Sequence, residues 1–332
     1  MELMPILRAL SRNKFGAILI ATQVAITMTI MVNAVFIIQE RQTLMSRPSG
    51  IDESNTFYIT STGFADNFNE EAVIEEDLNR LRKTPGVVDA IQTNMIPLSG
   101  SGWSMGLQTK PGTDIDSSYV AAYMVDEHAI NTFGINLIAG ENFKSSDIMV
   151  RRRSQSTWAD KIIVTKAMAE SLFPENWQSA VGNTVYINDT EPMTIIGVVE
   201  QLQGSWVSWD KVENSILVPE RTYFGSTIYL IRTEPGLRDE LMPQIEAMLA
   251  SSEKGRLLRR MRTMEETRKR SYEGDTAMSR ILTVVIVALL AITSLGIVGL
   301  ASFSVNRRRK QIGTRRALGA SRANILSYFM LE

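Results

Sequence analysis

Two long apolar stretches without charged residues, at residues 15–39 and 281–306, constrain this chain more than any other feature. About 20 consecutive apolar residues cross a bilayer core as a helix, because a helix satisfies its backbone polar groups without water. The first stretch is too long for the apolar region of a signal peptide, so we interpret it as a retained anchor. A buried helix of a soluble protein is the alternative for either stretch. The sequence predicts an integral membrane α-helical protein with two spans.

The distribution of charge predicts the orientation of these spans. Residues 1–14 carry three basic groups and one acidic group, and residues 307–332 carry seven and one. The chain has 35 basic and 36 acidic residues; these ends take ten and two, so 25 and 34 remain between them. Because lysine and arginine accumulate on the cytosolic side, we expect both ends to be cytosolic. Residues 254–270 hold eight basic residues on the proposed outer side, which weakens the prediction without reversing it.

The region between the spans predicts a large extracytoplasmic α/β (α+β) domain of two lobes. Residues 56–95 have the strand, helix, strand order of a βαβ unit. The expected elements are strands at 56–62, 87–95, 119–125, 193–200 and 227–232, helices at 70–83 and 237–250, a strand and helix within 161–176, and a turn-rich segment at 181–189. The expected division is an amphipathic cytosolic lead at 1–14, spans at 15–39 and 281–306, the outer domain at 40–280 and a cytosolic segment at 307–332.

Several kinds of chemistry are excluded or disfavoured by residues that the sequence lacks. There is no cysteine, so disulfides and thiolate metal sites are impossible. His128 is the only histidine, which removes most metal-binding and acid–base schemes. No phosphate-binding G-x-x-x-x-G-K-[ST] motif occurs, so ATP-driven work requires a partner. We expect no catalytic residue, no metal and no cofactor in this chain, with ATP and Mg bound by a partner ATPase.

Two short motifs suggest catalysis but lack the necessary context. Residues 102–106 match G-x-S-x-G, yet a strand before Ser104, a helix after it and a distant histidine are not in place. A glycine-rich turn is the favoured interpretation. Asp126 and His128 flank a glutamate, and adjacent residues of a helix do not face one another. A helix start with Asp126 near the N-cap explains this triplet better than a site.

Other conspicuous residues have structural interpretations. The arginine run at 151–153 predicts a solvated loop, and no interleaved aromatic residues suggest nucleic acid. Trp206 and Trp209 are expected to pack in a core or at an edge rather than to wall a channel. The sequence at Asn188 fits the glycosylation pattern, which is a weak signal.

Small and polar residues in the apolar stretches predict helix packing. Gly296, Gly299 and Ser302 recur every three positions, which allows another helix to approach closely. The first span carries Gln23, Thr27 and Asn33, and such residues more often form hydrogen bonds between helices than a transport path. We therefore expect a partner within the membrane.

The cytosolic segment after residue 306 carries the most specific signal. The span could be broken at Ile312 and Gly313, and residues 317–330 can form a helix with Leu318 and Ile325 near one face. Its basic side chains include Arg315, Arg316 and Arg322. This pattern suits an acidic protein partner or an anionic membrane surface, and periodicity alone does not choose between them.

The sequence IGTRRALGASRANILSYFMLE at 312–332 closely resembles the coupling segment of MacB/FtsX-like ABC transporter permeases. The N-terminal ILRALSRNKFGAILI is similar to the beginning of these proteins. In the middle, LIAGENF at 137–143 and SLFPEN, VGNTVYIN and IIGVVE within 161–200 resemble their MacB-like periplasmic core domain. The resemblance covers nearly the whole chain and is strongest after residue 306.

This resemblance implies a bacterial inner-membrane permease of the mechanotransmission type. In such a permease a separate ABC ATPase moves the periplasmic domains, for export of a peptide, toxin, drug or lipoprotein. The implied partners are that ATPase, a second permease in a homo- or heterodimer, membrane lipid and, in some systems, a periplasmic adaptor and outer-membrane channel. The residues implied to transmit the stroke are Ile312, Gly313, Arg315, Arg316, Ala317, Leu318, Gly319, Ala320 and Ser321.

Two departures from the family pattern qualify this expectation. Gln311 stands where these permeases often have an acidic residue. The family implies four spans, and this sequence holds two, so we expect it to be part of a longer permease.

A two-span receptor with an outer ligand-binding domain is the alternative function. Such a receptor should continue into heptad helices, whereas this chain has Gly313, Gly319 and a short amphipathic helix.

Overall fold

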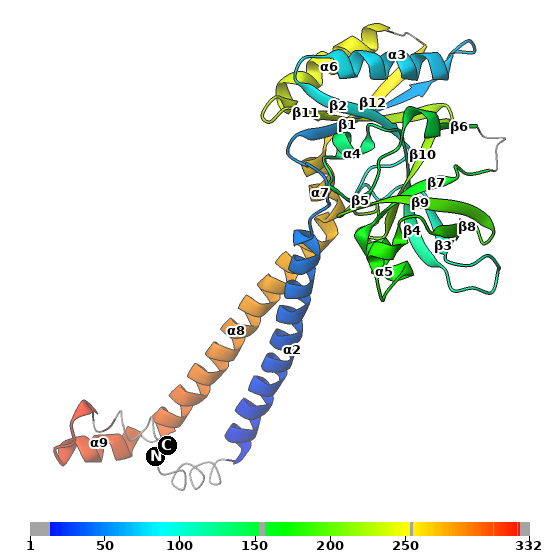
Figure 1. Ribbon diagram of the computed structural model, residues 1–332. Helices are drawn as coiled ribbons and strands as arrows, with labels where there is room; N and C mark the ends of the chain where they lie inside the picture. Colours follow the sequence, from blue (N-terminus) through cyan, green and yellow to red (C-terminus); the bar gives the residue numbers. More distant parts are fainter. Residues whose placement is uncertain (1–13, 153–156, 253–254, 308, 324, 326–332) are drawn as a thin grey trace. The chain divides into compact units, whose positions relative to one another are not determined.

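The structure is a computed structural model that describes residues 14–152, 157–252, 255–307, 309–323 and 325 (Figure 1). The chain divides into two compact units. The first unit comprises the described parts of Met1–Ser46 and Gly274–Glu332, and the second is Arg47–Glu273. The second unit is therefore a single continuous insertion between the two segments that form the first.

Two long helices dominate the first unit, α2 at Lys14–Ser46 and α8 at Glu273–Arg307, and a shorter helix, α9 at Arg309–Ala317, follows α8. By length and composition, α2 and α8 could both cross a membrane. In the most apolar 18-residue window, 11% of α2 and 0% of α8 is buried. A core helix of a soluble protein hides its apolar side chains, so this exposure suits a lipid environment better.

Polar contacts join α2 to α8 along their apolar lengths. The Thr27 and Thr293 hydroxyl oxygens lie 2.9 Å apart, and the Gln23 side-chain amide donates to the Ile292 carbonyl at 3.4 Å. Asn33 instead donates to a carbonyl of its own helix at 2.9 Å. In a membrane, such bonds between helices contribute about 0.6 kcal/mol on average. Two of the three polar residues predicted to face protein thus contact the neighbouring helix of this chain.

The second unit contains a four-stranded antiparallel sheet in the order β12-β1-β11-β2. Its strands are β1 at Thr56–Gly63, β2 at Val87–Thr93, β11 at Ser226–Thr233 and β12 at Arg256–Thr263. In sequence, α3 at Glu70–Lys83 joins β1 to β2, and α6 at Arg238–Ser252 joins β11 to β12. Because β11 lies between β1 and β2, the predicted βαβ unit is a split one. This is the β-α-β-β-α-β order of ferredoxin-like folds.

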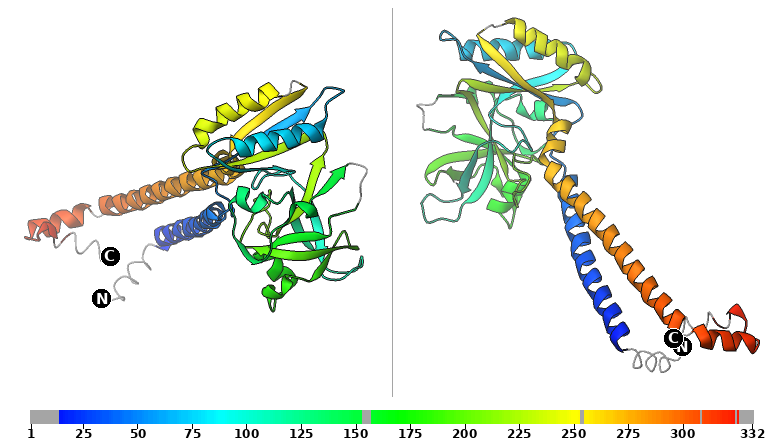
Figure 2. Two further views of the ribbon diagram at one scale, coloured as in Figure 1. Left: turned by 45° about the horizontal axis from the view of Figure 1, so that its top comes forward. Right: turned by 180° about the vertical axis from the view of Figure 1, so that it is seen from behind.

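Helices α3 and α6 cover the same face of this sheet (Figure 2). Asn69 caps α3 by accepting a hydrogen bond from the Ala72 N–H at 3.2 Å. The apolar residues of α3 recur at helical spacing and are buried against strands and α6. These core residues are Ile74, Leu78 and Leu81 from α3, Leu241, Ile245 and Leu249 from α6, and Phe57, Ile59, Tyr229 and Ile231 from the sheet.

A second sheet of eight strands occupies the chain between β2 and β11. Its strands are β3 at Ser104–Gln108, β4 at Ser118–Val125, β5 at Leu137–Gly140, β6 at Met149–Arg152, β7 at Lys161–Thr165, β8 at Thr184–Ile187, β9 at Glu191–Val199 and β10 at Ser215–Tyr223. Short helices are α4 at Ala129–Phe133, α5 at Lys166–Leu172, η1 at Ser145–Asp147, η2 at Trp177–Ala180 and, after β12, α7 at Met264–Ser271. The path runs β4-β3-β8-β9-β7-β10-β6, and β10 also pairs with β4, so the sheet closes on itself.

One hydrophobic core joins the two sheets. It contains Tyr58, Ile91 and Leu230 from the four-stranded sheet and Tyr123 and Leu217 from the eight-stranded sheet. The region is mixed α/β, as predicted, and forms one compact unit. Its division into two lobes stays a prediction, because the sheets share this core.

Candidate functional site

The predicted coupling residues form the last turns of α9 and the bend that follows it. Ile312, Gly313, Arg315, Arg316 and Ala317 lie in α9, and Leu318, Gly319, Ala320 and Ser321 follow. The Gly319 N–H donates to the Arg316 carbonyl at 3.1 Å, and the Ala320 N–H donates to the Arg315 carbonyl at 3.0 Å. These are the paired bonds of a Schellman cap. Gly319 has a φ of +92°, which only glycine adopts at little cost. The sequence therefore fixes a sharp end to α9.

We name residues 307–325, which include this bend, the basic turn. Leu318 is 81% exposed. The basic turn contains seven basic residues and no acidic residue. Arg315 and Arg316 lie in the last turn of α9, where the helix dipole stabilises positive charge. An exposed leucine in a segment with seven basic residues and no acidic residue suits a protein partner with an acidic surface around an apolar centre, and it also suits anionic lipid.

The three small residues predicted for helix packing have different environments. A Cβ added to Gly296 would lie 2.7 Å from the Gln23 side-chain amide, so glycine permits that contact between α8 and α2. A Cβ on Gly299 would meet nothing within 4 Å, and Ser302 is exposed. The structure thus brings Gly296 to α2 and leaves the other two positions open. Close approach of another helix at Gly299 and Ser302 stays a prediction.

Arg268 ties the segment that follows α2 to the helix that precedes α8. Its guanidinium donates to both carboxylate oxygens of Glu53, at 2.6 and 2.7 Å, and to the Arg47 carbonyl at 3.0 Å. Bidentate pairing of this kind is the strong form of an ion pair. The hydrogen bond with Glu53 raises the pKa of Arg268 against the opposing effect of burial. We call Arg268, Glu53 and the Arg47 carbonyl the Arg268 clamp.

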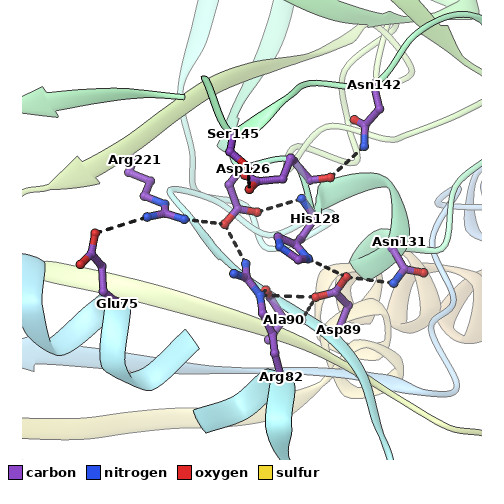
Figure 3. Close-up of polar contacts among 11 residues, drawn as sticks. Glu75, Arg82, Asp89, Ala90, Asp126, His128, Asn131, Asn142, Ser145 and Arg221 are labelled. Atoms are coloured by element: carbon purple, nitrogen blue, oxygen red, sulfur yellow. Dashed lines mark hydrogen bonds and ion pairs between the residues drawn. The ribbon is translucent and has the colours of Figure 1, made fainter. Parts of the chain in front are cut away.

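Figure 3 shows a polar cluster around the single histidine. Arg82 of α3 donates to Asp126, after β4, at 2.7 Å and lies 3.4 Å from Asp89 of β2. His128 Nδ1 lies 3.0 Å from the same Asp89 carboxylate. Arg221 of β10 lies 3.4 Å from Asp126. The cluster connects the elements of one sheet with those of the other, because it draws residues from α3, β2, β10 and the chain after β4.

The charges in this cluster stabilise one another. The hydrogen bond with Asp89 raises the pKa of His128, although burial and the charge of Arg82 oppose this. Burial alone would raise the pKa of Asp89, but hydrogen bonds from His128, Asn131 and the Ala90 N–H together lower it. A protonated His128 beside an ionised Asp89 is therefore the favoured state at mildly acidic pH. The described residues contain no group of three or more histidine, aspartate or glutamate side chains that could hold a metal ion.

The structure confirms one interpretation of a polar motif and corrects another. Asp126 lies two residues before His128, the N-cap of α4, and accepts from the His128 N–H at 3.1 Å and from Arg82, so it lies near the helix start as predicted. Arg151 does not lie in a solvated loop. It lies in β6, is 5% exposed, and donates to Glu220 of β10 at 2.8 Å, because β6 and β10 are neighbours. Arg153 lies outside the described residues.

Two motifs remain. Ser104 begins β3 and pairs with Ala121 of β4, so residues 104–106 form a strand and not the predicted glycine-rich turn, and the strand, turn and helix of a nucleophile elbow are not formed either. The Trp206 and Trp209 rings stack with centroids 4.5 Å apart, and Trp206 packs against the shared core. Sequence reasoning missed the Arg268 clamp and the polar cluster, since their partners are 215 and up to 95 residues apart in the chain.

Comparison with protein-family models identifies the family of this chain. The family model of the MacB-like periplasmic core domain matches residues 17–252, and that of the FtsX-like permease C-terminal region matches residues 283–332. The chain therefore belongs to the family of MacB/FtsX-like ABC transporter permeases, as its resemblance to them predicted. Membership makes it a permease component of a membrane-embedded transporter.

Named relatives support the same assignment. Macrolide export ATP-binding/permease protein MacB 1 of Yersinia pestis bv. Antiqua (strain Antiqua) is 23% identical over 337 residues, which cover 98% of this chain and 48% of the relative. Uncharacterized ABC transporter permease YknZ of Bacillus subtilis (strain 168) is 25% identical over 220 residues, covering 63% of this chain and 51% of the relative. This chain spans about half the length of these curated relatives.

Solved structures of extracytoplasmic regions are also similar. The periplasmic region of MacB from Actinobacillus actinomycetemcomitans has a TM-score of 0.40 at 16% identity, covering 68% of this chain and 96% of that chain. The extracellular domain of the noncanonic ABC-type transporter YknZ from Gram-positive bacteria has a TM-score of 0.38 at 16% identity, covering 61% and 99%.

Proposed function

We propose that this chain is the permease subunit of an ATP-driven transporter of the mechanotransmission type, in which a separate ATPase moves the extracytoplasmic unit. The observation that carries the proposal is the basic turn. Its Schellman cap holds Leu318 81% exposed beside Arg315 and Arg316, in a segment without acidic residues. A docked ATPase surface would bury the leucine and neutralise the arginines, which gives each feature a function.

The order of elements supports transmission of a stroke. Helix α8 begins at Glu273, directly after α7, and ends at Arg307, just before α9. A long helix is stiff along its axis, so a displacement of the basic turn would reach α7 with little loss. At α7 the Arg268 clamp would pass the displacement to the segment that follows α2. ATP and Mg would be bound by the ATPase, and this chain would bind no cofactor.

The proposal includes location, assembly and cargo. Both chain ends would be cytosolic in a bacterial inner membrane, with residues 40–280 periplasmic, because basic residues concentrate at the ends. A second permease would pack on the open face at Gly299 and Ser302. The cargo would be a peptide, toxin, drug or lipoprotein, and macrolide-like drugs are included because the Yersinia relative is named a macrolide exporter. A periplasmic adaptor and outer-membrane channel would complete some assemblies.

Affinity purification of the tagged chain from its native membranes tests the coupling. The wild-type protein is expected to retain an ABC ATPase and to stimulate its hydrolysis. The triple variant R315E/R316E/L318D should abolish both, because it reverses the charge and removes the exposed apolar contact. The matched control is K310A, which removes one positive charge from the first turn of α9, outside the predicted coupling residues, and should leave most of the retention and stimulation in place. Retention and stimulation by the triple variant at wild-type level would refute the coupling assignment.

Orientation has a separate test. Single cysteines at Lys310 and at Asp66 can be introduced without background, because the chain has no native cysteine. In intact spheroplasts, a membrane-impermeant maleimide should label position 66 and spare position 310. The reverse pattern would contradict cytosolic ends.

A further inference from the structure

A cavity of about 340 Å³ lies against one face of the four-stranded sheet. Residues of β1, β11 and β12 and of the segment after β2 line it, all within the second unit. Two arginines, Arg260 and Arg262, enter the lining from β12, and Tyr58, Thr60 and Ser101 contribute hydroxyl groups. No acidic residue lines the cavity. The cavity thus combines positive charge with neutral hydrogen-bond donors.

A β-bulge interrupts β12 beside this cavity. Tyr58 pairs with Arg262 and Thr60 pairs with Arg259, so two residues of β12 lie opposite one residue of β1. In a regular strand, positions 258, 260 and 262 would share a face. Here Leu258 and Met261 both pack on the core beneath α3 and α6, while Arg260 and Arg262 line the cavity. The extra residue changes which side chains face the cavity, as bulges commonly do.

The bulge has an energetic cost, and bulges and charged residues both protect edge strands from pairing with other chains. Arg260 has a φ of +53°, in the left-handed region that residues other than glycine rarely adopt. β12 is an edge strand, and Arg259 provides exposed charge there, with its guanidinium 3.3 Å from the Thr62 hydroxyl. Because the bulge and Arg259 already protect the edge, the second and third arginines, Arg260 and Arg262, which line the cavity, indicate a ligand.

The two arginines also differ from their neighbours in their partners. Elsewhere in this unit Arg82, Arg151, Arg256 and Arg268 each contact a carboxylate. Among the described residues, neither Arg260 nor Arg262 forms an ion pair; Arg262 donates to the Tyr58 hydroxyl at 3.4 Å. Tyr58 is 5% exposed, and its own O–H proton is free to be donated to an acceptor in the cavity. The cavity is therefore lined by two arginines and several hydroxyl groups but by no carboxylate.

We infer that this cavity binds a small organic anion, whose carboxylate or phosphate group contacts Arg260 and Arg262. The Tyr58 and Ser101 hydroxyls would donate to the remaining oxygen atoms, and Ile96 and Ile228 would contact the apolar part of the ligand. The planar guanidinium group of arginine can form two parallel hydrogen bonds with either a carboxylate or a phosphate group. The inference goes beyond the transport function and does not depend on the basic turn or an ATPase.

Isothermal titration calorimetry of the full chain in lipid nanodiscs tests the site with three probes. N-acetyl-leucine carries a carboxylate and an apolar side chain, N-acetyl-leucinamide is its neutral isostere, and inorganic phosphate represents the other anionic group. At least one anion is expected to bind, and N-acetyl-leucinamide should bind about tenfold more weakly than N-acetyl-leucine or not at all, since a charge-assisted hydrogen bond is lost. Binding by phosphate alone would identify a phosphate ligand, and binding by N-acetyl-leucine a carboxylate ligand.

Variants separate the site from the general charge of β12. R260Q/R262Q should weaken anion binding by about tenfold or more, and R259Q should leave it within about twofold. R260G removes the charge and also relieves the left-handed backbone, so it should stay folded and still lose affinity. The inference is overturned if R260G binds as tightly as wild type or if R259Q loses as much affinity as R260Q/R262Q. It is also overturned if neither anion binds up to about 10 mM, which is weaker than a specific site provides.

Discussion

Arginine has opposite environments in the two units of this protein. In the second unit, Arg82, Arg151, Arg256 and Arg268 contact carboxylates that come from distant parts of the chain. The basic turn contains seven basic residues and no acidic residue. The first set fastens elements together, because each charge is satisfied within the fold. Under the proposed function the second set contacts another molecule, so a substitution should affect stability in one unit and binding in the other.

The largest effect is expected from the pair of Arg256 and Asp77, whose side chains are 0% and 1% exposed. Asp77→Ala leaves a buried guanidinium without its carboxylate and should lower the free energy of unfolding by about 3–5 kcal/mol. Urea unfolding of the full chain, followed by circular dichroism, measures this. The control is Asp239→Ala, which removes a 79% exposed carboxylate and should change stability by less than about 0.5 kcal/mol. Equal losses in the two variants would show that burial does not strengthen the pair.

A smaller loss of stability is expected when the Arg268 clamp is removed. Arg268→Ala removes the hydrogen bonds to Glu53 and to the Arg47 carbonyl, so the free energy of unfolding should fall by about 1.5–3 kcal/mol. Arg270→Ala, at an exposed position of the same helix, should cost less than about 0.5 kcal/mol. The same urea titration compares them. If both variants unfold at the same urea concentration, the clamp does not fasten the segment after α2.

The polar cluster should give a pH dependence with a definite sign. Because the pKa of His128 is raised, the stability from its contact with Asp89 is fully present below the unfolded pKa of about 6.5 and is lost as pH rises through the folded pKa. The lowered pKa of Asp89 has the opposite effect, since its contribution is lost as the solution becomes strongly acidic. His128 is 35% exposed, so solvent screening limits its contribution to less than about 1 kcal/mol.

The single histidine makes this prediction easy to measure. An NMR titration should show one imidazole with a pKa above 6.5. His128→Gln should remove the part of the stability change between about pH 6 and 8 that comes from this imidazole. An imidazole pKa at or below 6.5, or an unchanged slope in the variant, would contradict the assigned contact.

The smallest effect on folding should come from the basic turn. Arg316→Ala removes an exposed charge and should change the free energy of unfolding by no more than about 0.5 kcal/mol. Under the proposed function, the same variant should weaken retention of the ATPase in the affinity purification. A loss of stability comparable to that of Arg268→Ala would mean that the basic turn fastens the fold and is not kept free for a partner.

Local signals made part of the fold predictable. The predicted helix at 70–83 has the same bounds as α3, because Asn69, the apolar spacing and Pro85-Gly86 all act within a few residues. The two apolar stretches lie within α2 and α8 for the same reason. The end of α9 was predicted wrongly: Ile312 and Gly313 lie inside the helix instead of breaking it, and Gly319 ends it with a Schellman cap where a helix at 317–330 was expected.

Strand β12 shows where local signals fail. Its sequence RLLRRMRT has neither regular alternation nor low charge, and no strand was predicted there. The pairing with β1 and the bulge determine which residues face the cavity and which face the helices. The polar cluster and the burial of Arg151 depend in the same way on partners from other strands.

The sequence by itself determined the two apolar helices, the basic turn, the family and several local elements such as α3, since length, hydrophobicity and short-range capping specify these. The tertiary structure alone decided that β11 separates β1 from β2, that Arg151 and Arg268 meet distant carboxylates, that Asp126 meets Arg82, and that Arg260 and Arg262 line one cavity. The physical reason is that each of these outcomes is a contact between segments far apart in the chain. Such contacts depend on sheet register and on the packing of the whole unit, which no short window of sequence contains.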